Sequence, residues 1–147
     1  MKKRRLVIMG LFAIGTVLVL CSCGGKSAKK QFAAKANAIC VSFNKANRAA
    51  GTPTSINEAI AQLEKLTPLY EKRIADLDKL TPPADEQATV NRVITLEKKR
   101  AALAKQVLAA LKKSDVTKAN TLIASGNADD KEAKGIYKKL GLTECAK

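Results

Sequence analysis

The sequence contains no histidine and no tryptophan, and only three phenylalanines and two tyrosines among its 147 residues. Without histidine, the chain lacks the side chain most often used as a general base and as a metal ligand. Its absence excludes catalysis by imidazole and metal binding through histidine. So few aromatic rings leave too little surface for stacking nucleotide bases, and we expect no nucleic-acid partner. A chain of this length builds one modest domain.

Acidic residues are also scarce, since 13 Asp and Glu stand against 27 Lys and Arg. The carboxylates that are close in sequence lie near predicted helix ends or on solvent-facing turns, where capping and solubility explain them. They are Asp76 with Asp78, Asp85 with Glu86, and Asp129 with Asp130. No glycine-rich phosphate loop and no nucleophile motif is present. We therefore expect no enzymatic activity, no cofactor and no metal site.

Only the N-terminus contains a long apolar run. Four basic residues at positions 2–5 precede the mostly apolar stretch 6–20, which is typical of a secretory signal. The stretch ends in Leu20-Cys21-Ser22-Cys23, followed by two glycines. With an aliphatic residue, two small residues and then Cys in this order, the segment resembles the lipobox of bacterial lipoproteins.

The lipobox resemblance implies cleavage after Ser22 and attachment of fatty acyl chains to Cys23. Residues 1–22 are then the signal peptide and residues 23–30 a lipidated, flexible tether. The protein is expected to be held on the extracytoplasmic side of the cell membrane. Two alternatives stay open, because about 18 apolar residues also suit an ordinary cleaved signal or an uncleaved membrane anchor.

The four cysteines divide between the signal and the body of the chain. Processing removes Cys21 and modifies Cys23, so Cys40 and Cys145 remain as thiols. Outside the cytoplasmic membrane these two are expected to form a structural disulfide. A catalytic redox role is disfavoured because the pair lacks the C-x-x-C spacing of such centres.

The body, residues 31–147, has helical periodicity and no strand pattern. Apolar residues recur at alternating spacings of three and four, which predicts amphipathic helices over residues 28–50, 56–80, 84–113 and 115–140. Ser55 and Glu58 form a predicted capping box. The alternation stays in phase across Pro68, which predicts a kinked helix with the proline ring outward. The turn-prone residues 125–130 leave open whether the fourth helix is continuous.

Short connections make neighbouring helices antiparallel, so the sequence predicts an all-α, up-down-up-down four-helix bundle. Its inward-facing stripes include Ile56 on the second helix and Val116 and Ile123 on the fourth. Because the termini share one end of such a bundle, the tail after Gly141 can place Cys145 beside Cys40. The pairing of the two thiols and the topology therefore agree.

Three short segments of the body carry a wider resemblance. They are Ala38-Ile39-Cys40, Leu80-Thr81-Pro82-Pro83-Ala84 and Gly141-Leu142-Thr143-Glu144-Cys145-Ala146. With them the chain is similar to small secreted helical lipoproteins of actinobacteria. The resemblance implies an exported helical domain stapled by a disulfide, and it implies no activity.

Polar residues interrupt the inward stripes at three positions. Glu97 and Arg100 are three apart on the third helix, and Asp130 lies on the fourth. Arg100 is expected to pair with Glu97 and, if the helices are in register, with Asp130. One interpretation is a polar niche in which Arg100 receives an anionic ligand. The other is an internal ion pair, or an Arg that reaches the edge of the bundle.

Basic residues form the second candidate site. Removing the four basic residues of the signal from 27 leaves 23 against 13 acidic residues, a formal charge of +10 on the processed chain. The candidate contacts to an anionic surface lie next to the lipid and on the third helix: Lys26, Lys29, Lys30, Lys35, Lys98 and Lys99. They would attract anionic lipid head groups or cell-wall polymers. The alternative is an ordinary solvated face.

Together these features predict a membrane-anchored, non-enzymatic lipoprotein that acts as a binding or scaffold module of the cell envelope. Its partners would be the membrane, through the lipid anchor, and an envelope protein. The alternative function is a carrier of a small anionic ligand, or a binder of anionic lipid or cell-wall polymer through basic residues. A large apolar cavity would favour the carrier, whereas a filled core with an exposed apolar or basic face would favour the protein-binding module.

Overall fold

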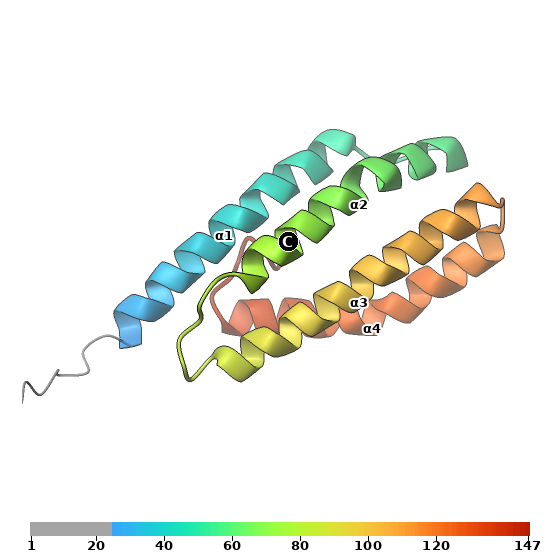
Figure 1. Ribbon diagram of the computed structural model, residues 1–147. Coiled ribbons are helices and arrows are strands. Elements are labelled where there is room, and N and C mark those ends of the chain that lie inside the picture. The colour runs from blue at the N-terminus through green and yellow to red at the C-terminus, as the bar shows by residue number, and fades with distance from the viewer. Residues whose placement is uncertain (1–24) are drawn as a thin grey trace, which may run out of the picture.

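The computed structural model describes residues 25–147, which form four helices in chain order. They are α1 (Gly25–Ala50), α2 (Ile56–Asp78), α3 (Gln87–Lys112) and α4 (Val116–Lys139). Consecutive helices run antiparallel, and the molecule is the predicted up-down-up-down bundle (Figure 1). The predicted signal peptide and Cys23 lie outside the described residues. Among residues 25–147, no helix combines the length and apolarity that crossing a membrane requires.

The helix ends follow the predicted local signals. The Ser55 hydroxyl accepts a hydrogen bond from the Glu58 backbone N–H at 3.2 Å and caps α2. The Glu58 carboxylate accepts from the backbone N–H of Thr54 at 2.7 Å, so the reciprocal bond of the capping box is shifted by one residue. Gly51 and Gly141 have φ of 70° and 71°, a left-handed conformation that side chains rarely adopt.

Two predicted boundaries are wrong. Residues 25–30 belong to α1, where we expect a flexible tether, because Ala28 and the three lysines are good helix formers and Lys29 pairs with Asp85 at 2.6 Å and with Glu86 at 3.1 Å. α3 begins at Gln87 and not at residue 84, since the backbone N–H of Glu86 donates to the Pro83 carbonyl in a separate turn.

Both helices that could have been interrupted, α2 at Pro68 and α4 at residues 125–130, are continuous. α2 continues through Pro68, whose ring lies exposed on the outer face as predicted. α4 is unbroken through residues 125–130. A cross-helix contact accounts for Gly126, because a Cβ at this position would lie 2.8 Å from the Leu103 Cδ2 atom. The glycine therefore lets α4 approach α3 closely.

The main core lies at the end of the bundle where α1 begins. It contains Phe32 and Ala36 of α1, Ile74 and Leu77 of α2, five apolar residues of α3, and Ala133 and Tyr137 of α4. The disulfide joins Cys40 to Cys145 across 105 residues and is itself buried in this core. A smaller core cluster of Val107, Ala110 and Ala119 lies further along α3 and α4. With two core clusters and a covalent staple, residues 25–147 form a unit that folds by itself.

The C-terminal residues 141–147 connect α1 to the rest of the bundle. α1 packs against α2, α2 against α3, and α3 against α4, whereas among the described helices α1 and α4 do not pack closely together. The tail makes the connection through Asn37, whose side chain donates to the Gly141 carbonyl at 3.2 Å and accepts from the Glu144 N–H at 2.9 Å. Asn44 donates to the Glu144 carbonyl at 2.7 Å.

The opposite end of the bundle is open. The end where α2 begins and α3 finishes carries a groove lined by residues of α2, α3 and α4. Three side chains predicted to face inward here, Ile56, Val116 and Ile123, are 44%, 40% and 52% exposed, so those predictions are wrong. The apolar side chains in the last two turns of α1 are only the alanines at positions 46, 49 and 50, which bury little area and do not close the bundle.

Candidate functional site

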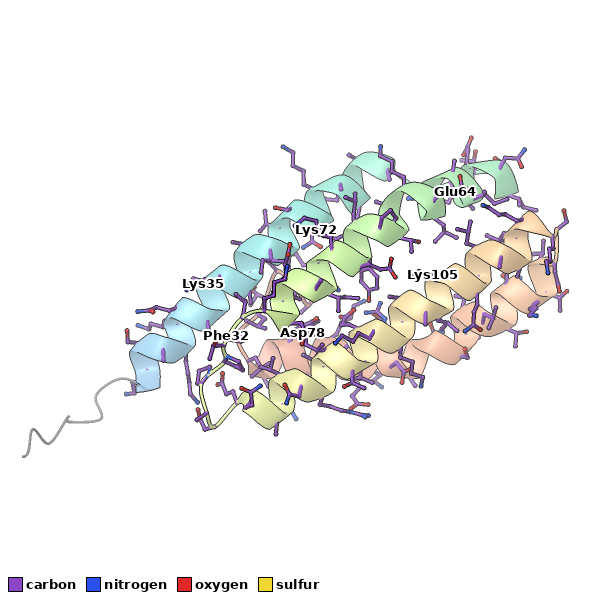
Figure 2. All side chains as sticks on the ribbon, in the orientation of Figure 1. Phe32, Lys35, Glu64, Lys72, Asp78 and Lys105 are labelled. Carbon is purple, nitrogen blue, oxygen red and sulfur yellow. A yellow bond between two sulfur atoms is a disulfide. The ribbon has the colours of Figure 1, made fainter. Side chains whose placement is uncertain are left out.

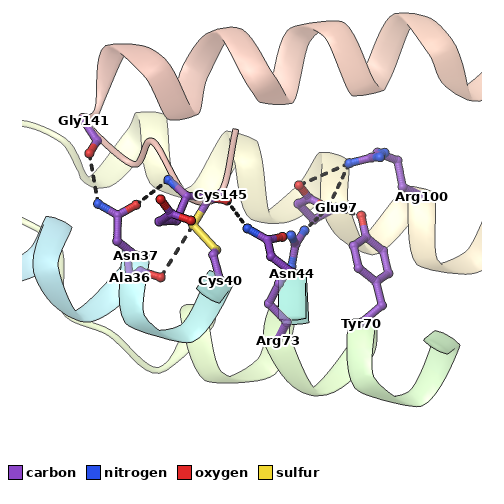
Figure 3. The surroundings of a disulfide bond; sticks show 11 residues. Ala36, Asn37, Cys40, Asn44, Tyr70, Arg73, Glu97, Arg100, Gly141 and Cys145 are labelled. Carbon is purple, nitrogen blue, oxygen red and sulfur yellow. Dashed lines mark hydrogen bonds and ion pairs between the residues drawn. A yellow bond between two sulfur atoms is a disulfide. The ribbon is translucent and has the colours of Figure 1, made fainter. Parts of the chain in front are cut away.

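A buried carboxylate organises the middle of the bundle. The residue Glu97, on α3, is fully buried. Its carboxylate accepts from Arg73 Nη2 at 3.0 Å and from Arg100 Nη1 at 3.2 Å, and the Tyr70 hydroxyl contacts the same group. Figure 3 shows the two arginines and the tyrosine converging on this one side chain. Two positive charges thus compensate one buried negative charge.

Arg73 is the member of this cluster that the sequence interpretation misses. It lies on α2 and is 7% exposed. Its guanidinium carbon is 4.9 Å from the Phe43 ring centroid and 4.7 Å from that of Tyr70, so two aromatic faces enclose the cation. The signal was present in the sequence, because position 73 is three after Tyr70 and four before Leu77 on the inward stripe.

Arg100 makes both predicted contacts. Besides Glu97, it reaches Asp130 on α4, with Nη2 2.6 Å from Oδ1. Asp130 also pairs with Lys134 at 3.0 Å. The Arg100 side chain keeps 27% of its surface exposed, so it stands between the buried cluster and the opening of the bundle. The structure therefore brings Glu97, Arg100 and Asp130 together.

Burial shifts the acid–base behaviour of the cluster. Burial raises the pKa of Tyr70 and that of Tyr137 well above the ordinary tyrosine value, and the negative charge of Glu97 raises both further. Burial lowers the pKa of Arg100, but interactions with Tyr70, Glu97 and Asp130 outweigh it, and this pKa lies above its ordinary value. Both tyrosines therefore stay neutral and Arg100 stays charged at physiological pH.

A polar cavity of about 240 Å³ lies beside the cluster. Its walls carry four basic side chains, Arg73, Arg100, Lys134 and Lys147, against the two acidic side chains of Glu97 and Asp130. Since Lys147 also pairs with Glu144, the excess is one positive charge. Among the described residues, the buried Nε–H of Arg73 has no hydrogen-bond partner. An unsatisfied buried donor is costly, and together with the excess of positive charge it favours an anion or another acceptor in the cavity.

The disulfide forms part of the wall of this cavity. Cys145 and Lys147 of the C-terminal tail line it together with Asn44 and Asn47 of α1. Since the Cys40–Cys145 bond fastens the tail to α1, the disulfide holds one wall of the cavity in place. Figure 3 shows the bond, with Asn44 next to Arg73 and Glu97.

An apolar groove occupies the open end of the bundle. Its volume is about 540 Å³, within the range of small-molecule sites. The lining comes from α2, α3 and α4 and includes Leu63, Leu103, Val107, Leu111 and Ile123. Tyr70, Arg100 and Asp130 line both this groove and the polar cavity. The groove therefore ends at the ionic cluster, which separates apolar walls from polar ones.

Half of the predicted basic surface is already neutralised. Lys29 pairs with Asp85 and Glu86, Lys98 pairs with Asp78 at 2.7 Å, and Lys99 pairs with Asp129 at 2.8 Å. No acidic side chain of residues 25–147 lies within 4 Å of the other three candidates, Lys26, Lys30 and Lys35. These are exposed on the first turns of α1, where Figure 2 labels Lys35.

The two tyrosines place their hydroxyl groups differently. Tyr137 is 1% exposed, and its hydroxyl is buried without a partner in the described part of the chain. The reason is the C-terminal tail, whose Leu142 and Cys145 belong to the same core cluster. Tyr70 instead uses its hydroxyl on Glu97.

Comparisons with known proteins find no matching family model, no matching curated protein and no matching solved structure. Among residues 25–147, no three carboxylate, thiol or imidazole side chains are grouped as they would be to hold a metal ion.

Proposed function

We propose that this protein is a lipid-anchored, non-enzymatic binding protein on the extracytoplasmic side of the membrane, and that it holds a small anionic ligand beside Arg73 and Arg100. The observation that supports the proposal most is the polar cavity, where basic side chains outnumber acidic ones and the partly exposed Arg100 guanidinium forms part of the wall. A carboxylate or similar anion in the cavity would accept hydrogen bonds from Arg100 and offset the excess positive charge.

The open groove favours ligand binding over protein scaffolding. A scaffold face would be a continuous apolar or basic surface on the outside of a filled bundle. Here the core is instead open at one end, and the exposed Ile123 is part of a concave wall that leads to Arg100. Concavity with a few convergent polar groups is typical of small-molecule sites.

A second function is supported by the position of the unpaired lysines. Lys26, Lys30 and Lys35 follow closely after the predicted lipidation site at Cys23. Basic residues this close to a membrane are attracted to anionic head groups, at about 1 kcal/mol for each one near the surface. We propose that they reinforce the lipid anchor, so the bundle lies near the membrane surface.

Changing Cys23 to Ser tests the anchor. With a clickable fatty acid supplied to growing cells, we expect the wild-type chain to be labelled and to sediment with membranes. The Cys23→Ser chain should lose the label, because serine has no thiol to form the thioether. The matched control, Cys21→Ser, should keep it. Labelling that survives Cys23→Ser would contradict the lipoprotein assignment.

Acetate titration of residues 25–147 tests the anion site. We expect saturable binding, measured by calorimetry, and about tenfold weaker binding by Arg100→Gln, since a charge-assisted hydrogen bond contributes roughly 1.5 kcal/mol or more. The control is Lys72→Gln, which removes an exposed positive charge that pairs with Asp76 on the outer face of α2. It should bind acetate like the wild type. Equal weakening by both variants would mean that only overall charge matters.

A further inference from the structure

The polar cavity and the apolar groove share one boundary, and their contrast suggests what kind of molecule spans it. Tyr70, Arg100 and Asp130 contribute to both spaces. On one side lie Arg73 and two lysines, and on the other lie aliphatic side chains of three helices. A ligand that fills both spaces must carry an anionic group at one end and a hydrocarbon body at the other.

From this arrangement we infer that the ligand is a single-chain anionic amphiphile, with its charged group at the two arginines and its chain along the groove. This inference rests on the proposed anion site, and it adds that the ligand also carries a hydrocarbon chain. Charge complementarity sets the orientation, since the basic residues are at the inner end and Ile123 is at the outer, exposed end.

The apolar residues of the open end support a hydrocarbon occupant. Ile123 is 52% exposed, and the partly buried Leu63 and Leu111, which pack against a smaller core cluster, line the same groove. A chain lying there would cover apolar surface that α1 leaves uncovered. One linear chain suits this groove because the walls come from three adjacent helices and follow the direction of α3.

Matched ligands separate the contributions of the chain and the charge. We would titrate residues 25–147 with acetate, octanoate and octan-1-ol, after verifying by thermal unfolding that each variant is folded. Each buried methylene strengthens binding by up to about fourfold. We therefore expect octanoate to bind at least about 100-fold more tightly than acetate. We expect octan-1-ol, which has the chain without the charge, to bind at least about tenfold more weakly than octanoate.

Two variants test whether the hydrocarbon chain of octanoate lies along the groove. Ile123→Glu puts a charge on the exposed wall of the groove, and it should weaken octanoate binding at least about tenfold while leaving acetate binding unchanged. Val41→Glu is the matched control, because Val41 is 44% exposed on α1 and lines neither space. It should bind both ligands like the wild type. Since Ile123 is exposed, its replacement leaves the buried core intact.

The outcomes distinguish this inference from the proposed function. If acetate and octanoate bind with equal affinity, the proposed anion site is supported, and the inference that a hydrocarbon chain lies in the groove is wrong. If neither ligand binds, the proposed anion site fails and the inference fails with it. If octan-1-ol binds as tightly as octanoate, the groove takes a hydrocarbon without an anionic group, and the amphiphile inference is overturned. Insensitivity of octanoate binding to Ile123→Glu would overturn the placement of the chain.

Discussion

Replacing Cys40 and Cys145 together by serine lowers the free energy of unfolding by about 4 kcal/mol. The disulfide closes a loop of 105 residues, and cross-linking so distant a pair removes much of the conformational entropy of the unfolded chain. The loss is a large share of the 5–15 kcal/mol that stabilises a typical domain. Chemical denaturation of residues 25–147, followed by circular dichroism, measures it.

Three comparisons separate the covalent link from side-chain packing. Cys40→Ser and Cys145→Ser singly should cost nearly as much as the double variant, because either one removes the bond. A reducing agent should destabilise the wild type to a similar extent and leave the double variant unchanged. The double variant should also bind acetate more weakly, since only the hydrogen bonds of Asn37 and Asn44 then hold the tail that carries Lys147 to α1. A cost below about 1 kcal/mol would contradict this role of the disulfide.

Changing Glu97 to Ala is expected to cost about 3–5 kcal/mol of unfolding free energy. The substitution leaves Arg73, which is 7% exposed, without the negative charge that compensates it, and it removes the acceptor of the Tyr70 hydroxyl. Arg100 keeps Asp130 as a partner, so its positive charge stays compensated in the variant. Denaturant unfolding of the variant at neutral pH provides the measurement.

A neutral replacement of the whole pair supplies the control for Glu97. The double variant Glu97→Leu with Arg73→Met replaces two buried charges by apolar side chains of similar size, and it should recover most of the lost stability. Glu132→Ala is the matched surface control. Glu132 pairs with Arg92 at 2.7 Å, but both side chains are about half exposed, and loss of this pair should cost no more than about 1 kcal/mol. Equal costs for Glu97→Ala and Glu132→Ala would show that burial does not govern the cluster.

Local signals predicted the helices well, because capping and periodicity act within a few residues of the chain. Ser55 caps α2, Gly51 and Gly141 take positive φ, and Pro68 lies outward without breaking the helix. The disulfide was predictable for another reason, since only two cysteines remain in the body and the topology places Cys145 beside Cys40.

The open end and the buried arginine were not predicted, because both depend on how far whole helices approach one another. The apolar stripe runs as regularly through Ile56 and Ile123 as through Ile74, so periodicity alone indicates a closed bundle. Only the assembled structure shows that α1 does not cover α4 at this end. In the same way, Arg73 meets Glu97 only through the register of α2 against α3.

The most direct test of the anion site follows the side-chain Nε–H of Arg73 by nuclear magnetic resonance while acetate is added to ¹⁵N-labelled residues 25–147. This donor is buried and has no partner among residues 25–147, and the Arg73 side chain lines the polar cavity. We predict that its signal shifts progressively and saturates together with the calorimetric binding curve, whereas the signal of the exposed Arg48 does not move. An Arg73 signal that stays unchanged while acetate binds elsewhere would contradict the proposed site.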